Sequence, residues 1–238
     1  MKTSMEYVGK AKTLRPSPDN SGFIMEFRDD LTAFNGEKKL ALSGKGLINK
    51  KINSLIMQYL ETKNIRTHWI KDLDDRSTLV HHLKMFPLEC VVRNKAAGSL
   101  CKRLGLASGE VLNPTIFEFY LKKDELGDPF INESHIQTFG WATKDQVEQL
   151  KTASLKINTI LSELFNACGC DLIDFKLEFG LTEDNSIVLA DEITPDGCRI
   201  WDQKSGDILD KDRFRKDLGD VLESYELIYI RLFKHLSK

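Results

Sequence analysis

Apolar residues recur along the chain at two spacings, and each spacing predicts a different kind of element. Over residues 46–63 they recur at helical spacing, which predicts an amphipathic helix with one apolar face. The same spacing predicts a helix over 143–169, opened by a Thr-x-x-Gln capping box, and a last helix over 214–232 that Asp212 caps. We interpret these apolar faces as core packing surfaces.

Short apolar runs bounded by turn residues predict the strands. In the first part of the chain these runs cover 6–14, 22–28, 67–70, 78–84 and 89–93, with a polar turn over 30–39. Later runs cover 116–122, 171–180 and 187–193. Strands mixed with a few helices predict an α+β protein. We divide it into a small β-rich lobe, residues 1–85, and a larger α+β lobe, residues 86–238, with a cleft between them.

The composition limits the kinds of partner that this protein is expected to bind. The chain has 238 residues with 34 Lys and Arg against 36 Asp and Glu, a net charge of −2 that favours neither nucleic acid nor a membrane surface. No apolar run approaches the roughly 20 residues of a membrane span, and the first residues lack an apolar signal core. The five cysteines form no Cys-x-x-Cys pair, which is typical of reduced thiols. We therefore expect a cytoplasmic protein.

The run 171–180 alternates polar and apolar residues, which places Asp174, Lys176 and Glu178 on one face of a strand. A turn signal follows, so the next strand is expected to fold back and bring Asp191 close to Glu178. Two carboxylates at such a short distance repel each other unless a cation lies between them. We predict Mg²⁺ on this pair, completed by water and phosphate oxygens. A strand with one solvated face is the alternative.

Two other segments gather cations. Arg93 and Ser99 belong to a glycine-containing basic segment that follows a buried strand, and such groups suit a phosphate monoester. A plain basic surface loop explains the same residues equally well. Near the start of the chain, Lys10 and Lys12 stand two apart on a predicted strand, so both are expected on one face, toward a polyphosphate. By itself that Gly-Lys-Ala-Lys run is a weak signal, and it is not a Walker loop.

Six motifs occur in an order that resembles the SAICAR synthetases over nearly the whole chain. They are Gly-Lys-Ala-Lys (9–12), Thr-Ala-Phe-Asn-Gly (32–36), Glu-Cys-Val-Val-Arg-Asn-Lys-Ala-Ala-Gly-Ser-Leu (89–100), Asp-Phe-Lys-Leu-Glu-Phe-Gly (174–180), Asp-Glu-Ile-Thr-Pro-Asp-Gly-Cys-Arg-Ile-Trp-Asp (191–202) and Asp-Lys-Asp-Arg-Phe-Arg (210–215). One such motif is weak evidence, whereas six in order are specific.

The resemblance implies an ATP- and Mg²⁺-dependent ligase of de novo purine biosynthesis. Such an enzyme joins carboxyaminoimidazole ribotide to L-aspartate and releases SAICAR, ADP and phosphate. The resemblance also implies two lobes related to protein kinases and ATP-grasp enzymes, with ATP in the cleft, and a homodimer. A small-molecule kinase on the same scaffold and an inactive nucleotide-binding module are the alternatives.

Site residues follow from the resemblance by position. The ATP site matches Gly9, Lys10, Ala11, Lys12 and Lys122, and a kinase-like hinge would bring the backbone of Glu89 to Val91 against adenine. The metal ligands match Glu178 and Asp191. The ribotide-binding residues match Arg93, Ser99, Asp174, Lys176 and Arg199. The expected catalytic residues are Lys12, Lys122, Lys176 and Asp191, and the candidates for aspartate are Asn35, Lys211 and Arg215. Val8 and the pair Leu14-Arg15 depart from the family pattern beside the phosphate loop.

Overall fold

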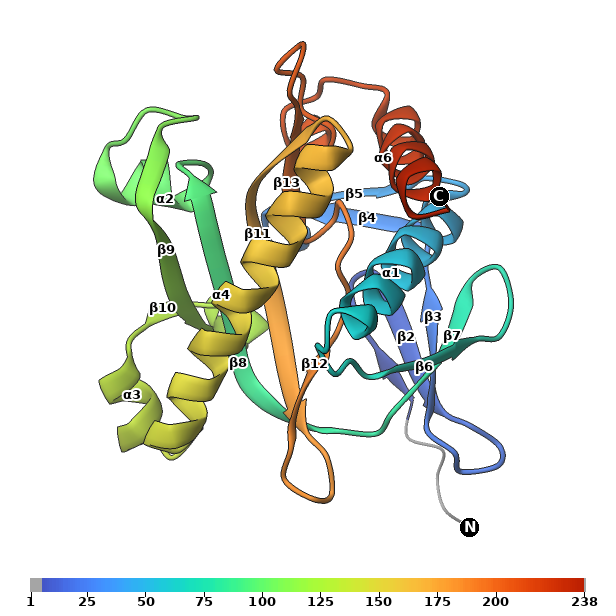
Figure 1. The fold of residues 1–238 in the computed structure, drawn as a ribbon, viewed down its shortest axis with the longest axis vertical. Helices are drawn as coiled ribbons and strands as arrows, with labels where there is room; N and C mark the ends of the chain where they lie inside the picture. Colours follow the sequence, from blue (N-terminus) through green and yellow to red (C-terminus); the bar gives the residue numbers. More distant parts are fainter. Residues whose placement is uncertain (1–5, 238) are drawn as a thin grey trace.

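The computed structural model describes residues 6–237, apart from the side chain of Asn35, and it contains two main antiparallel sheets (Figure 1). The smaller sheet has the order β1-β2-β3-β7-β6. Its strands are β1 (Tyr7–Val8), β2 (Lys12–Pro16), β3 (Phe23–Phe27), β7 (Ser77–Val80) and β6 (Trp69–Asp72). A separate ribbon is formed by β4 (Asp30–Ala33) and β5 (Lys38–Ala41), joined by the 3-10 turn η1 (Phe34–Gly36).

The larger sheet has the order β10-β9-β8-β11-β12, and β13 also pairs with β11. Its strands are β10 (Phe130–Ile131), β9 (Val111–Leu121), β8 (Lys84–Lys95), β11 (Cys170–Leu181), β12 (Ile187–Ala190) and β13 (Cys198–Asp202). Short helices connect them: α2 (Ser99–Leu104), η2 (Asp124–Leu126), α3 (Glu133–Thr138) and α5 (Asp212–Arg215). The predicted α+β class is confirmed.

Three long helices complete the fold. The helix α4 (Lys144–Ala167) lies across one face of the larger sheet, and its N-terminus carries the predicted capping box between Thr143 and Gln146 (Figure 1). The helices α1 (Lys45–Thr62) and α6 (Val221–Leu236) pack against each other. One hydrophobic core joins α1, α4, α6 and the larger sheet, whereas the smaller sheet has its own small core around Met25, Phe27 and Val80. The helix α1 therefore packs into the core of the larger sheet.

The hairpin predicted around Glu178 and Asp191 is confirmed. The strand β11 pairs antiparallel with β12, and Glu178 lies opposite Ala190, the residue before Asp191. The predicted strand over 187–193 is shorter than expected, because Asp191 has a φ of 60° and ends the extended conformation.

Three other strand predictions were wrong in a way that matters for the site. The run 6–14 is two strands, because residues 9–11 turn between β1 and β2 and the Gly9 amide donates to the Lys12 carbonyl. The run 78–84 ends at Val80, and residues 81–83 then connect the smaller sheet to the larger one. Similarly, the strand expected over 67–70 begins only at Trp69, since Thr67 forms a parallel bridge to Leu189 instead.

Two predicted helical features and one predicted turn also differ. The helix expected over 214–232 is interrupted, because Asp217, Gly219 and Asp220 have positive φ angles that separate α5 from α6. The N-cap of α5 is Lys211, and Asp212 is its first residue, so Asp212 does not cap the last helix. The polar turn expected over 30–39 contains the β4–β5 ribbon.

Gly180 allows the close approach of β11 to the segment that connects the two sheets. A Cβ at this position would lie 2.6 Å from Leu83 Cβ and 3.0 Å from Met85 Sδ. We expect Gly180→Ala to lower the free energy of unfolding by about 1–3 kcal/mol through overpacking. Urea unfolding measures this change, with Gly197→Ala as the control because its Cβ would approach only the Thr194 carbonyl oxygen, at 4.0 Å. Equal stability of the two variants would contradict the prediction.

Candidate active site

Three lysines and four carboxylates meet where the two sheets approach each other. We call them the lysine–carboxylate cluster: Lys12, Lys122, Lys176, Glu89, Glu178, Asp191 and Glu192. Lys12 of β2 places its Nζ 2.5 Å from Asp191 Oδ1 and 2.7 Å from Glu192 Oε1. Lys176 of β11 places its Nζ 2.5 Å from Glu178 Oε1, 3.0 Å from Asp191 Oδ2 and 3.3 Å from Glu89 Oε1.

The sheet register explains how this cluster forms. Glu178 and Glu89 are direct cross-strand partners on β11 and β8, and Asp191 follows the partner of Glu178 on β12. Lys122 comes directly after β9 and pairs with Glu178. Glu178 is only 1% exposed, so the alternative of a strand with a solvated polar face is wrong at this position. Ammonium groups instead neutralise the facing carboxylates.

The charges of the cluster keep Lys12, Lys176 and Asp191 ionised. Burial disfavours the charged form of Lys12, but Asp191 and Glu192 outweigh it and raise the pKa of Lys12 above its ordinary value. Burial opposes charge on Lys176 too, yet Asp191, Glu178 and Glu89 raise its pKa. Burial alone would raise the pKa of Asp191, whereas the surrounding lysines hold it well below the usual range. An anionic ligand would therefore meet fully charged ammonium groups.

The backbone of Asp191 is held in an unusual conformation by its neighbours. Its positive φ is uncommon for a residue with a side chain. On one side, the His68 amide donates to the Leu189 carbonyl, and on the other the Ile193 amide donates to Asn53 Oδ1. The buried ring of His68 lies against the Asp191 backbone, and burial lowers the pKa of His68 to about 4. No pattern in the sequence points to His68, because more than a hundred positions separate it from Asp191.

The donor atoms of Glu178 and Asp191 fit the predicted Mg²⁺. Each oxygen of these two carboxylates accepts a hydrogen bond from a lysine ammonium group, so all of them already face positive charge. Within residues 6–237, no group of three or more Asp, Glu, His or Cys side chains is arranged to hold a metal alone. Mg²⁺ would therefore need phosphate oxygens as further ligands, which is its usual manner of binding.

A second cluster of charges lies further along β11. We call it the arginine–carboxylate cluster: Arg93, Arg103, Arg199, Arg215, Glu118, Asp174 and Asp212. Arg93 and Arg199 share Asp174, at 2.7 Å and 2.8 Å, because β8 and β13 flank that residue on either side. Asp212 accepts from Arg199 and from Arg215. Asp174 thus belongs to the arginine–carboxylate cluster and Glu178 to the lysine–carboxylate cluster, and both lie on the same strand, β11.

The two predicted phosphate-binding arginines differ in how many of their guanidinium nitrogens already have partners. Arg93 is 3% exposed, and its nitrogens donate to Glu118, Asp174, Ser99 and Tyr120, so it is fixed in place. Arg199 uses Nε and one terminal nitrogen on Asp212 and Asp174, and its Nη2 has no partner within the described part of the chain.

Gly98 gives that free nitrogen room. A Cβ on Gly98 would lie 2.3 Å from Nη2 of Arg199, so only glycine lets the basic segment approach the guanidinium this closely. The hydroxyl of the next residue, Ser99, contacts Arg93 at 3.2 Å. Free guanidinium and hydroxyl donors therefore converge beside Gly98.

A third feature, which the sequence analysis missed, anchors the loop between the two clusters. Asp196 Oδ2 accepts from Lys45 Nζ at 2.6 Å and from Asn49 Nδ2 at 2.8 Å, and Oδ1 accepts from Tyr225 Oη at 2.8 Å. The Lys45 side chain is fully buried. We call these four residues the Asp196 anchor; they tie the loop to α1 and α6. Helical spacing alone could not predict this anchor, because in the sequence Lys45 looks like any polar residue at the start of a helix.

Not every predicted site residue lies as expected. The backbone of Glu89 to Val91 pairs with β9 on one side and β11 on the other, and its contact with adenine stays a prediction. Lys10 lies in the β1–β2 turn and pairs with exposed Asp124, so it does not share a strand face with Lys12. Of the aspartate candidates, Lys211 and Arg215 flank α5, and the side chain of Asn35 lies outside the described residues.

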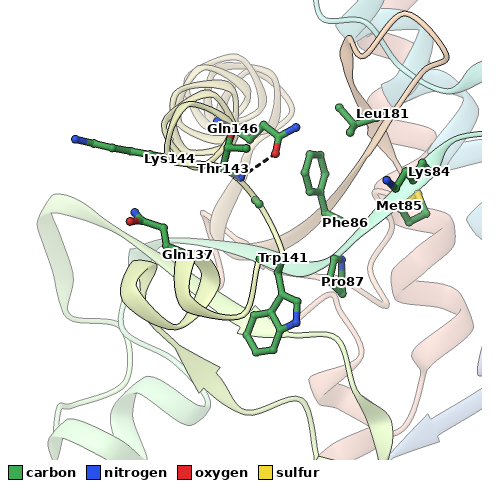
Figure 2. Close-up of a pocket in the computed structure, with 12 residues that line it drawn as sticks. Lys84, Met85, Phe86, Pro87, Gln137, Trp141, Thr143, Lys144, Gln146 and Leu181 are labelled. Atoms are coloured by element: carbon green, nitrogen blue, oxygen red, sulfur yellow. Dashed lines mark hydrogen bonds between the residues drawn. The ribbon is translucent and has the colours of Figure 1, made fainter.

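Two further features lie apart from both clusters. A pocket of about 590 Å³ between the start of β8 and the N-terminus of α4 contains no predicted site residue, and Figure 2 shows Phe86 and Trp141 among its lining side chains. Burial raises the pKa of the Cys168 thiol, to about 11, and that of Cys170, which disfavours a reactive role.

Within residues 6–237 no helix is both long and apolar enough to cross a membrane.

Together, the fold and the two clusters define a class of protein: an α+β enzyme that acts on phosphorylated substrates. Residues 5–232 match the model of the SAICAR synthetase family. A phosphoribosylaminoimidazole-succinocarboxamide synthase of Hahella chejuensis is 53% identical over 226 residues, which cover 95% of each chain. The chain belongs to the SAICAR synthetase family, and it is an enzyme of that family.

Solved structures agree with this assignment. The crystal structure of phosphoribosylaminoimidazole-succinocarboxamide synthase from Ehrlichia chaffeensis superposes with a TM-score of 0.93 at 45% identity, covering 95% of this chain and 97% of that one. A SAICAR synthetase in complex with ADP also gives a TM-score of 0.93, at 46% identity, covering 96% of this chain and 97% of that one.

Acid should weaken the Asp196 anchor. Burial opposes the charge of Asp196, but Lys45 and Lys211 lower the pKa of its carboxyl from 3.8 to about 2. Because the folded-state pKa is the lower one, this ionised carboxylate stabilises the fold above about pH 4, and the effect is lost as the pH falls toward 2. We expect Asp196→Asn to lower the free energy of unfolding by about 3–5 kcal/mol at pH 7.

The measurement is urea unfolding of both proteins over a series of pH values. The difference between them should shrink by about 2 kcal/mol as the pH falls from 4 to 2. A difference independent of pH would contradict the role given to Asp196.

Proposed function

We propose that this protein joins carboxyaminoimidazole ribotide to L-aspartate, with ATP split to ADP and phosphate, in de novo purine biosynthesis. The observation that carries the proposal is the arrangement of two clusters on one face of β11, with phosphate-type donors at Asp174 and lysines at Glu178. Four residues of strand span about 13 Å.

The lysine–carboxylate cluster would bind the phosphates of ATP. Lys12 lies on the β2 side of the cluster and Lys122 and Lys176 on the side of the larger sheet, so phosphates between them would contact ammonium groups on both sides. A carboxylate resists attack by an amine, and phosphorylation gives it a good leaving group. Phosphoryl transfer of this kind depends mainly on positioning and on neutralising charge. The absence of histidine from the cluster suits that chemistry.

The arginine–carboxylate cluster would bind the ribotide. Arg199 offers a free nitrogen beside Gly98 and Ser99, which suits the ribotide phosphate. Arg93 would contribute through the orientation of Ser99, which it contacts, since its own nitrogens are occupied. Asp174 and Lys176, on the same face of β11, would border the imidazole, so that its carboxylate points toward the lysines.

Glu178 and Asp191 would hold Mg²⁺ together with phosphate oxygens of ATP. The ion would neutralise charge that develops on those oxygens during phosphoryl transfer. The protein's own part is to fix the two carboxylates, which it does through the β11–β12 register and the positive φ of Asp191. The lysines that pair with these two carboxylates would supply further positive charge to the phosphate oxygens.

We also propose that the smaller and larger sheets act as two lobes, divided near residue 85, with ATP bound between them. The change of sheet across residues 81–83 supports this division. Gly9 and Ala11, in the turn beside Lys10 and Lys12, would bring their backbone close to the ATP phosphates. A homodimer in the cytoplasm is the assembly and location that the family resemblance suggests.

The experiment that tests the proposal measures ADP formation with ATP, Mg²⁺ and carboxyaminoimidazole ribotide, with and without L-aspartate. We expect sustained ADP release only when aspartate is present, with one SAICAR formed per ADP. Sustained release without aspartate would instead identify a small-molecule kinase. Nucleotide binding without turnover under either condition would identify an inactive binding module.

Asp191→Asn tests the metal and phosphate role of the lysine–carboxylate cluster. We expect turnover to fall by roughly 10²–10³-fold, since a charge that acts on the transferred phosphate is lost. The protein should stay folded, because Lys12 keeps Glu192 and Lys176 keeps Glu178. The control is Asp184→Asn, a change in the exposed turn of the same hairpin. Near-normal turnover of Asp191→Asn at saturating Mg²⁺ would refute the assignment.

A further inference from the structure

Three polar residues of α1 form a stripe along a buried side of the helix. Lys45, Asn49 and Asn53 stand four positions apart, so successive turns place them one above the other. All three are at most 1% exposed. We call them the polar stripe of α1. Burying a polar side chain costs free energy unless it is hydrogen-bonded, so the contacts of the stripe indicate what it is for.

Every member of the stripe contacts the loop that begins at Asp191. The first two members bind the Asp196 carboxylate and belong to the Asp196 anchor. Asn53, one turn further along the helix, accepts a hydrogen bond from the Ile193 amide through Oδ1, at 2.9 Å. The stripe therefore fixes the loop at two points, and the point closer to Asp191 depends on Asn53.

The turn just before Ile193 allows two consecutive acids to bind one lysine. Lys12 Nζ lies 2.5 Å from Asp191 Oδ1 and 2.7 Å from Glu192 Oε1. In an extended strand, consecutive side chains point to opposite faces, so both acids could not reach one ammonium group. The positive φ of Asp191 ends the strand and brings both carboxylates to the same lysine. Such a backbone conformation persists only where the surrounding structure holds it.

Hydrogen bonds hold this turn at both ends. Before the turn, the Leu189 amide donates to the Arg66 carbonyl at 3.1 Å, and the Leu189 carbonyl accepts from the His68 amide at 2.8 Å. After the turn, Asn53 accepts from the Ile193 amide. The first end is held by backbone groups, which any residue supplies, whereas the second end depends on the identity of one side chain.

We propose that Asn53 is a positioning residue for Asp191. The proposal rests on the proposed function, in which Asp191 and Glu178 hold Mg²⁺ together with phosphate oxygens of the nucleotide. Asn53 acts through the backbone of the loop: its bond to Ile193 keeps the turn in the conformation that directs the Asp191 carboxylate toward Lys12 and Lys176. Without that acceptor the Ile193 amide would be left unbonded, and the turn would lose its support on this side.

The test compares ADP binding by the wild type and by Asn53→Leu, measured by isothermal titration calorimetry with excess Mg²⁺ and again with EDTA. Leucine keeps nearly the size of asparagine and removes its acceptor. We expect the dissociation constant for ADP with Mg²⁺ to rise roughly 10- to 100-fold, the range for losing a partner that orients a metal ligand. The constant with EDTA should not change. A merely structural role of Asn53 would alter both constants equally or neither.

Ser54→Ala is the matched control. Ser54 is the next residue of α1, is 3% exposed, and donates to Asp72 Oδ1 of β6 at 2.7 Å. Its loss should lower the melting temperature, as the loss of Asn53 should, but it should leave both ADP constants unchanged. If Asn53→Leu does not fold, Asn53→Ala removes the same acceptor and carries the same expectation. An unchanged constant with Mg²⁺ in a folded Asn53 variant would overturn the proposal, and so would an equal rise with Mg²⁺ and with EDTA.

The wild type tests the proposed function separately. If ADP binding to the wild type does not depend on Mg²⁺, the metal role proposed for Asp191 and Glu178 fails. If the wild type depends on Mg²⁺ and the Asn53 variant keeps the wild-type constant, only the assignment of Asn53 fails.

Discussion

The pairing of β11 with β8, β12 and β13 is the interaction on which the site depends. One face of β11 packs Phe175, Leu177 and Phe179 into the main core. The opposite face carries Asp174, Lys176 and Glu178. Since successive side chains of a strand alternate, burying the apolar face fixes where the polar face points. A slip of one residue would turn the charged side chains into the apolar core, away from their ion-pair partners, and would destroy core and site together.

Burial of charge is the second constraint on this molecule. Asp174, Glu178 and Arg93 are all nearly inaccessible, and a lone buried charge costs several kcal/mol. The structure meets this cost by pairing: lysines surround Glu178, and two arginines share Asp174. The same pairing keeps the cationic groups charged and held in place.

The loop from Asp191 to Arg199 links the two clusters, and the Asp196 anchor fixes it to distant helices. Lys45 and Asn49 come from α1 and Tyr225 from α6, so the position of the loop depends on how these helices pack. The main hydrophobic core contains residues of these same two helices, α1 and α6, together with residues of the larger sheet. Packing of the helices and geometry of the site are therefore coupled through one buried carboxylate.

The sequence by itself determined the elements whose cause is local. Periodic spacing predicted α1 and α4, the capping box predicted the start of α4, and alternation with a turn signal predicted the approach of Glu178 and Asp191. The family motifs also contain most of the residues that the structure gathers into the two clusters, whereas Arg103, Glu118 and Lys122 lie outside them. Each of these inferences needs only neighbours along the chain or a single hairpin.

Only the tertiary structure decided what depends on contacts between distant segments. The central place of β8 paired the backbone of Glu89 to Val91 on both sides, and the turn at Gly9 separated Lys10 from Lys12. The Asp196 anchor joins Lys45 and Asn49 of α1 to a loop far along the chain, so it is visible only in the folded protein. The physical reason is that hydrogen-bonding capacity is shared among side chains far apart in sequence, so the remaining donors emerge only from the complete fold.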